Sequence, residues 1–154
     1  MNYYADVILP LPLQGTFTYE LSKKEYENLG IGHRVAVSFG KRKVYTGVIK
    51  EIHNNKPALY ETKPIEFIYD KEELISESQI DFWSWISRYY FTPIGDVLKA
   101  AIPSTFLLES ETIIIKKEIN SDDIDQMTDD EYLIYEALDF KTLKINEVSD
   151  ILDK

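Results

Sequence analysis

The spacing of apolar side chains changes near residue 78, and this change restricts the possible folds more than any other feature of the sequence. Before it, apolar residues alternate with period two in segments such as 15–21 and 34–39, a pattern typical of strands with one face in a core. After it, Ile80, Trp83 and Ile86 recur at helical spacing. The sequence therefore predicts an α+β fold, in which a small antiparallel sheet or partial barrel packs against two helices.

The first half of the chain is predicted to contain strands and one short helix. Ser22 and Glu25 have the spacing of a capping box, so a helix is expected over 22–29, closed by Gly30. Turn-forming residues separate the predicted strands. These strands are expected over 5–12, 15–21, 34–39, 44–52 and 63–69.

Two consecutive helices are predicted after the change of period. The first is expected over 78–91, and Pro93 ends it. Pro93 also suits the first turn of a second helix, which would run through Ala101 until Pro103. One more strand is expected over 112–119, before an acidic link at 120–126.

The C-terminal segment is predicted to add a small helical unit. Thr128 and Glu131 form another capping-box pattern, so a helix is expected through Leu138. A short strand over 142–145 and a final helical segment capped by Asn146 would follow.

The composition is that of a globular chain without thiol chemistry. Hydrophobic residues make up 44% of the 154 residues and cysteine is absent, which excludes disulfides and thiolate metal sites and fits a reducing compartment. The N-terminus has no basic region followed by a long apolar run, so neither a signal peptide nor a membrane span is expected. We expect a cytoplasmic protein.

The net charge of −10 is distributed unevenly. Over residues 1–65, nine Lys and Arg exceed six Asp and Glu, whereas over 118–154 three basic residues face twelve acidic ones. Phosphate contacts are made by Lys and Arg. The N-terminal part is therefore expected to be able to bind an anion, whereas the C-terminal part is not expected to bind one by itself.

Three cations stand in the predicted hairpin loop that begins at Gly40. Glycine would let backbone amides approach a ligand, and Lys41, Arg42 and Lys43 would contact phosphates. The same pattern is also common in solvated loops that prevent a sheet edge from pairing.

Phe17 stands between two threonines in a predicted strand, so its ring and the hydroxyls point to opposite faces. The ring could stack on a nucleic-acid base. Single aromatic residues in strands are more often core residues, so the residue by itself leaves both interpretations open.

Two other functions are weighed against nucleic-acid binding. Trp85, Tyr89 and Tyr90 could form an aromatic patch that docks on a protein partner, which would make the chain an interaction or scaffold module. A hydrolase that uses Asp96 is disfavoured because the neighbouring acidic residues are not spaced as a catalytic pair and no histidine lies near.

Three blocks of sequence occur in an order and spacing typical of one known family. They are Leu9-Pro10-Leu11-Pro12 with Thr16-Phe17-x-Tyr19, then Gly32-x-Arg34-Val35-x-Val37-x-Phe39-Gly40-x-Arg42 with Gly47-Val48, and Tyr89-Tyr90-x-x-Pro93-Ile94-Gly95-Asp96-Val97-Leu98 with Pro103. Together they resemble the N-terminal region of the PriA family of primosomal replication-restart helicases, over about residues 3–108.

The resemblance implies a domain over 1–108 that binds the 3′ terminus of the nascent leading strand at stalled replication forks. By position, Phe17, Thr18, Gly40 and Lys63 match the family's pocket for the terminal nucleotide. Lys41, Arg42 and Lys43 would contact phosphate beside it. Thr18 is a departure from the family pattern, because some relatives carry an acidic side chain at that position.

The same resemblance implies the organisation of the remaining chain. Residues 109–127 would be a linker with a possible strand, and 128–154 an incomplete winged-helix domain. The ATPase lobes of a 3′–5′ helicase, with their ATP, Mg²⁺ and Zn²⁺ sites, would lie downstream. This chain is therefore expected to be non-catalytic and without cofactors. Its expected partners are 3′ ends of single-stranded DNA, branched fork DNA and other primosome proteins, and not membranes.

Overall fold

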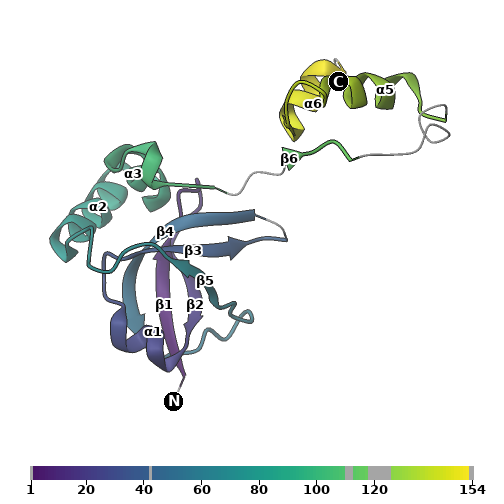
Figure 1. Cartoon of the computed structure of the whole chain (residues 1–154). Coiled ribbons are helices and arrows are strands. Elements are labelled where there is room, and N and C mark those ends of the chain that lie inside the picture. The colour runs from purple at the N-terminus through teal and green to yellow at the C-terminus, as the bar shows by residue number, and fades with distance from the viewer. Residues whose placement is uncertain (1, 42, 110–112, 118–125, 153–154) are drawn as a thin grey trace. The chain divides into compact units, whose positions relative to one another are not determined.

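A computed structural model describes residues 2–41, 43–109, 113–117 and 126–152 of the chain (Figure 1). The chain divides into two compact units, Met1–Ser110 and Glu111–Lys154. Within the described ranges, none of the helices has the length and the apolar character that a membrane crossing requires.

The first unit is built on a five-stranded sheet in the order β2-β1-β4-β3-β5, with every neighbouring pair antiparallel. The predicted strands are confirmed, although the first begins two residues earlier and ends four residues earlier than predicted, and the second and last are shorter than predicted. Their bounds are Tyr3–Ile8 for β1, Phe17–Leu21 for β2, Arg34–Phe39 for β3, Lys43–His53 for β4 and Ile65–Ile68 for β5.

The sheet curls so that its two edges approach each other (Figure 1). The N–H of Glu20 on edge strand β2 donates to the carbonyl of Lys63 at 2.9 Å, and Glu20 forms a parallel bridge with Pro64, just before the opposite edge strand β5. A twisted sheet that nearly meets itself is a half-barrel. The predicted α+β fold with a partial barrel is confirmed.

The two faces of the sheet carry separate cores, as period-two alternation requires. The concave face holds one apolar cluster, to which every strand contributes and which includes Val7, Tyr19, Val37 and Ile49. The other face presents Ile8 and Val48 to the helices α2 (Glu77–Tyr90) and α3 (Ile94–Ala101). These two helices lie side by side in Figure 1.

The helix boundaries follow local capping signals. Ser22 caps α1 (Lys23–Asn28) with the predicted capping box, but the helix ends at Leu29 in an extended conformation, so Gly30 does not close it as predicted. A second capping box at Ser76 starts α2 at Glu77, one residue earlier than its apolar periodicity indicated.

The turn into α3 brings the helix against the connection after β1. A β-carbon on Gly95 would lie 2.2 Å from the carbonyl oxygen of Leu11 and 2.3 Å from that of Leu9. Any side chain at this position would therefore clash with the backbone. Gly95 therefore permits a close approach of backbone to backbone, as its place in the Pro93–Asp96 corner predicts. Asp96 lies in the first turn of α3, where a carboxylate suits the positive end of the helix.

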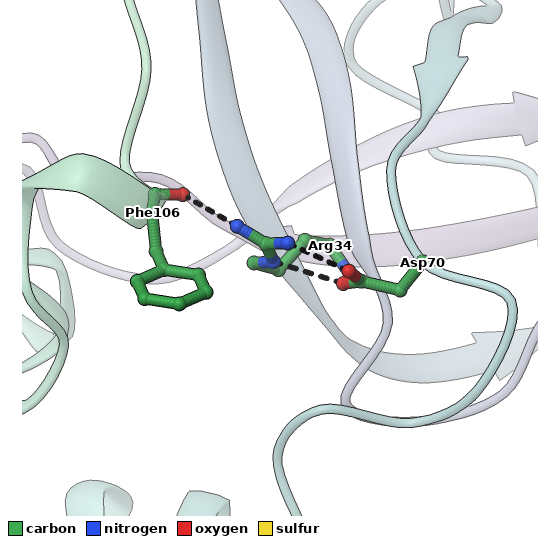
Figure 2. A network of polar contacts seen from close by, with 3 residues as sticks. All are labelled: Arg34, Asp70 and Phe106. Atoms are coloured by element: carbon green, nitrogen blue, oxygen red, sulfur yellow. Dashed lines mark hydrogen bonds and ion pairs between the residues drawn. The ribbon is translucent and has the colours of Figure 1, made fainter.

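Figure 2 shows a polar network that links three distant segments of the first unit. The Arg34 guanidinium donates to Asp70 through Nε at 2.9 Å and through a terminal nitrogen at 2.6 Å, and to the carbonyl of Phe106 at 3.2 Å. Hydrogen bonds from Arg34 hold the pKa of the Asp70 carboxyl below its usual value. This bidentate pair fixes the start of β3 against the segment after β5 and against the 3₁₀ turn Ser104–Phe106.

Among its described residues, the second unit has β6 (Ile113–Ile114) paired antiparallel with β7 (Leu143–Lys144), and the helices α5 (Asp129–Ala137) and α6 (Ile145–Ile151). The predicted Thr128 capping box is confirmed.

Two sequence-based expectations for this unit differ from the structure. The N-cap of α6 is Lys144 and not Asn146, because the final helix follows β7 directly. Of the strand expected over 112–119, only β6 is formed among the described residues, and residues 115–117 are irregular. Thr112, Glu118 and Ile119, together with all of the expected acidic link except Gln126, lie outside the described residues.

Candidate functional site

A pocket of about 300 Å³ opens where the curled sheet closes on itself, and it is lined by Phe17, Thr18, Gly40 and Lys63. Three segments far apart in the sequence supply these residues: the start of β2, the turn after β3 and the loop before β5. The four residues predicted to form one site therefore do surround one cavity. Its volume is at the lower end of the range for small-ligand pockets, about 300–1,000 Å³.

The loop before β5 forms one wall because it satisfies the free edge of β2. The N–H of Thr18 donates to the Tyr60 hydroxyl at 3.1 Å, and the N–H of Glu20 donates to the Lys63 carbonyl at 2.9 Å. Alternate N–H groups of an edge strand point in the same direction. Binding both of them to one loop covers this edge and fixes the loop in place.

Phe17 forms an aromatic wall that is only partly buried. Its ring meets that of Phe39 edge to face, with centroids 4.7 Å apart and planes at 68°. The ring also packs against the concave core. The two interpretations of Phe17 are therefore compatible, because a ring held in place on one side can present its other side to a ligand.

Gly40 and Lys63 meet across the mouth of the pocket. The Lys63 ammonium donates to the Gly40 carbonyl at 2.8 Å. Gly40 has a φ of +70°, a conformation that is strained for a residue with a side chain, and no described residue lies within 4 Å of the place where its β-carbon would stand. The Gly40 carbonyl therefore holds the Lys63 ammonium at the edge of the pocket, and Gly40 itself leaves the pocket open.

Thr18 differs from Lys63 because its side chain bonds to a residue outside the pocket lining. Its hydroxyl donates to the Asp6 carboxylate at 2.7 Å, across the β1–β2 pair. The His53 Nε2 lies 3.3 Å from the same carboxylate oxygen. With its proton engaged in this way, the Thr18 hydroxyl can still accept a hydrogen bond from another group.

The floor of the pocket is less polar than its rim. Tyr19 is buried and its hydroxyl donates to the Ser38 carbonyl at 3.1 Å. Burial, with a smaller contribution from Tyr60, raises the pKa of Tyr19 to about 12, so this hydroxyl stays protonated at neutral pH. Charge is confined to Lys63 and Glu61 in the lining.

Of the predicted phosphate-contacting residues, Lys41 and Lys43 do not belong to the lining of the pocket. Lys41 is exposed in the turn after Gly40. Lys43 begins β4, and its ammonium is 6.0 Å from the centre of the Tyr45 ring. Arg42 lies outside the described residues. A phosphate-binding role for the three cations stays a prediction.

Sequence reasoning did not anticipate that Tyr60, Glu61 and Phe39 would also line the pocket. Tyr60 comes shortly after a stretch of polar turn residues. An aromatic residue in such a loop was the one sequence signal that could have indicated a place in a binding site. Nothing in the sequence indicated that it would lie against Thr18, 42 residues away.

Four of the aromatic residues of α2 form a second feature, well exposed on the helix surface. Phe82, Trp85 and Tyr89 stack in succession, with centroids 5.9 and 5.1 Å apart, and Tyr90 meets Tyr89 edge to face. All four are exposed by 48% or more. The patch expected from Trp85, Tyr89 and Tyr90 therefore exists as a surface, and Phe82 extends it.

Comparison with known proteins gives a consistent result. Residues 6–103 match the family model of the PriA 3′DNA-binding domain (3′BD). The chain is 33% identical over 113 residues to replication restart protein PriA of Buchnera aphidicola subsp. Acyrthosiphon pisum, an alignment that covers 73% of this chain and 15% of that protein.

Proteins with the same name in two other bacteria are similar over comparable lengths. The one from Treponema pallidum is 27% identical over 108 residues, covering 68% of this chain and 16% of the relative. The one from Chlamydia pneumoniae is 31% identical over 102 residues, covering 66% of this chain and 13% of the relative. The chain thus spans less than a fifth of the length of each of these relatives. Because the family model matches more than half of its residues, the chain belongs to the PriA family of 3′ DNA-binding domains.

Proposed function

We propose that the pocket holds the terminal nucleotide at the 3′ end of a DNA strand, and that this strand is the nascent leading strand at a stalled replication fork. The observation that carries the proposal is the convergence of Phe17, Thr18, Gly40 and Lys63 on one cavity. A terminal nucleotide bound without base preference needs a ring to stack on and a few polar groups for the sugar and phosphate.

The chemistry of the lining supports selection of a free 3′ end. The Glu61 carboxylate of the lining can accept a hydrogen bond from a 3′-hydroxyl. The Glu61 carboxylate in the lining would repel a 3′-phosphate, while the Lys63 ammonium at the rim suits the phosphate on the 5′ side of the terminal nucleotide.

The experiment compares three single-stranded oligonucleotides of one sequence that end in a 3′-hydroxyl, a 3′-deoxy sugar or a 3′-phosphate. Fluorescence anisotropy titrations should give the tightest binding for the 3′-hydroxyl and the weakest for the 3′-phosphate. Equal affinity for all three would contradict a pocket for the terminus, even if the chain binds DNA.

The wider role follows from the same proposal. The chain would act as the fork-recognition part of a cytoplasmic, ATP-dependent 3′–5′ helicase, and would assemble with other primosome proteins. The catalytic lobes and their ATP, Mg²⁺ and Zn²⁺ sites would belong to other regions of such a protein.

The alternative function is a module that docks on a protein partner through the exposed aromatic stack of α2. Salt dependence separates the two functions, because DNA binding must weaken as salt rises. If Trp85→Ala leaves DNA binding and its salt dependence unchanged while Phe17→Ala weakens it, DNA recognition lies at the pocket and not at the aromatic stack.

A further inference from the structure

A second pocket, of about 400 Å³, lies between the sheet and α2. Its lining includes Thr16 just before β2, Lys50 on β4, and Ser84 and Arg88 on α2. Thr16 directly precedes Phe17, so one short segment borders both this pocket and the pocket for the terminal nucleotide. The function proposed above does not use this second pocket.

Lys50 enters the second pocket from an irregularity in the sheet. Asp6 pairs with Glu51 and the next residue, Val7, pairs with Ile49, so the register of β1 and β4 skips Lys50. Such a β-bulge redirects the side chain of the extra residue, and bulges are common beside functional sites. Lys50 is half-buried, and in the described part of the chain its ammonium has no hydrogen-bond or ion-pair partner.

The α2 wall adds a second cation and a buried hydroxyl. Arg88 Nε donates to the Ser84 carbonyl at 3.3 Å, which leaves the two terminal nitrogens of the guanidinium without a partner among the described residues. The Ser84 hydroxyl oxygen is buried, and within the same residues nothing hydrogen-bonds to it. Buried polar groups are nearly always satisfied, so this one calls for a ligand or another explanation.

The charges around the pocket favour an anion. Lys50 and Arg88 outnumber the one carboxylate of the lining, that of Asp81. The Ser87 hydroxyl donates its proton to the Thr92 carbonyl at 2.6 Å and so cannot donate to a ligand. Lys50, Arg88 and the Ser84 hydroxyl, which keep donors open within the described residues, are the donors that a tetrahedral oxyanion needs.

We propose that this second pocket binds a phosphate group through Lys50 and Arg88. On DNA, the group would be a backbone phosphate of the same strand whose 3′ end occupies the first pocket; this part rests on the proposed function. The strand can reach both pockets because the consecutive residues Thr16 and Phe17, at the start of β2, border one pocket each. A backbone phosphate held by Lys50 and Arg88 would therefore fix the direction in which the DNA leaves the terminal pocket.

The first test uses inorganic phosphate and does not depend on DNA binding. In a titration followed by ¹H–¹⁵N NMR of the full chain, the amides of Gly15, Thr16, Lys50 and Ser84 should shift to saturation. Lys50→Gln should abolish the saturation, Lys50→Arg should retain it, and Lys99→Gln, which removes an exposed cation of α3 outside both pockets, should leave it unchanged. Shifts that do not saturate, or that are the same in Lys50→Gln and Lys99→Gln, overturn the proposal.

The second test identifies the source of the phosphate. With a single-stranded oligonucleotide of twelve nucleotides and a free 3′ end, Lys50→Gln should weaken binding about fivefold at low salt and reduce the slope of log affinity against log salt by about 0.7. A mononucleotide that fills only the terminal pocket should bind equally to the wild-type chain and to this variant.

The possible failures can be told apart. If phosphate saturates the pocket but Lys50→Gln and Lys99→Gln bind the oligonucleotide equally, the site serves a free phosphate compound, and the DNA part of the proposal is wrong. If phosphate saturates the pocket while 3′-hydroxyl and 3′-blocked oligonucleotides bind equally, the terminal pocket fails and the phosphate site stands.

Discussion

At the scale of single residues, Phe17 determines whether the terminal pocket can hold a base. Phe17→Ala should weaken binding of 3′-ended single-stranded DNA by about 1–3 kcal/mol, because it removes the partly buried ring of β2 that would stack on a base. Fluorescence titration measures the effect. Phe67→Ala is the matched control, since Phe67 is 59% exposed on β5 and does not line the pocket. An equal loss in both variants would show that the ring of Phe17 has no special role.

Tyr19 makes the stability of the first unit sensitive to alkaline pH. Its pKa is raised to about 12 by burial, so the folded state holds the phenolic proton more tightly than the unfolded state does. The resulting stabilisation is fully present below the unfolded pKa of about 10 and is lost as pH rises through the folded pKa.

We therefore expect the free energy of unfolding to fall between about pH 10 and pH 12, and to fall less steeply in Tyr19→Phe. Urea titrations at several pH values measure it. The same slope in the wild-type chain and the variant would exclude Tyr19 as the cause.

At the scale of elements, the Arg34–Asp70 pair joins β3 to the segments that follow β5 and α3. Arg34→Lys keeps the charge but loses the bidentate contact and the hydrogen bond to the Phe106 carbonyl. With both side chains only 14% exposed, we expect a loss of about 2 kcal/mol in the free energy of unfolding. Lys23→Met, at an exposed i,i+4 pair on α1, should change it by less than about 0.5 kcal/mol in a parallel denaturation.

The end of α2 contains a residue in an unfavourable conformation. Phe91 is the C-cap, with a φ of +51° in the left-handed region, and 92% of its surface is exposed. Replacing it by glycine, Phe91→Gly, should raise the free energy of unfolding by about 1 kcal/mol, because glycine adopts this conformation without strain. Tyr90→Gly, one residue earlier within the helix, should lower it by about 1 kcal/mol. Thermal unfolding measures both effects, and a Tm that shifted in the same direction in both variants would contradict this account.

At the scale of the whole molecule, the two compact units differ in charge. Acidic residues exceed basic ones by eight over residues 111–154 and by only two over residues 1–110. A strongly acidic segment tethered to a DNA-binding unit repels phosphate, most strongly at low salt. The fragment 1–110 should therefore bind 3′-ended DNA more tightly than the full chain, and the difference should shrink as salt rises. A constant difference across the salt series would point to a non-electrostatic cause.

Much of the secondary structure was predictable because its causes lie close together in the chain. The capping boxes at Ser22 and Thr128 involve residues three positions apart, and they start helices in the structure as predicted. The errors have a related origin. Gly30 and Asn146 have suitable residue types for caps, but the helix ends were decided by the neighbouring structure, for example by β7 directly before α6.

The sequence alone determined which segments are strands and helices, and the resemblance of its motifs indicated which four residues to examine together. Only the tertiary structure decided that these residues surround one cavity, that Tyr60 binds the edge of β2, and that a bulge turns Lys50 toward α2. The physical reason is that periodicity and capping act over a few neighbouring residues. The curl and register of a sheet depend on pairing between segments tens of residues apart.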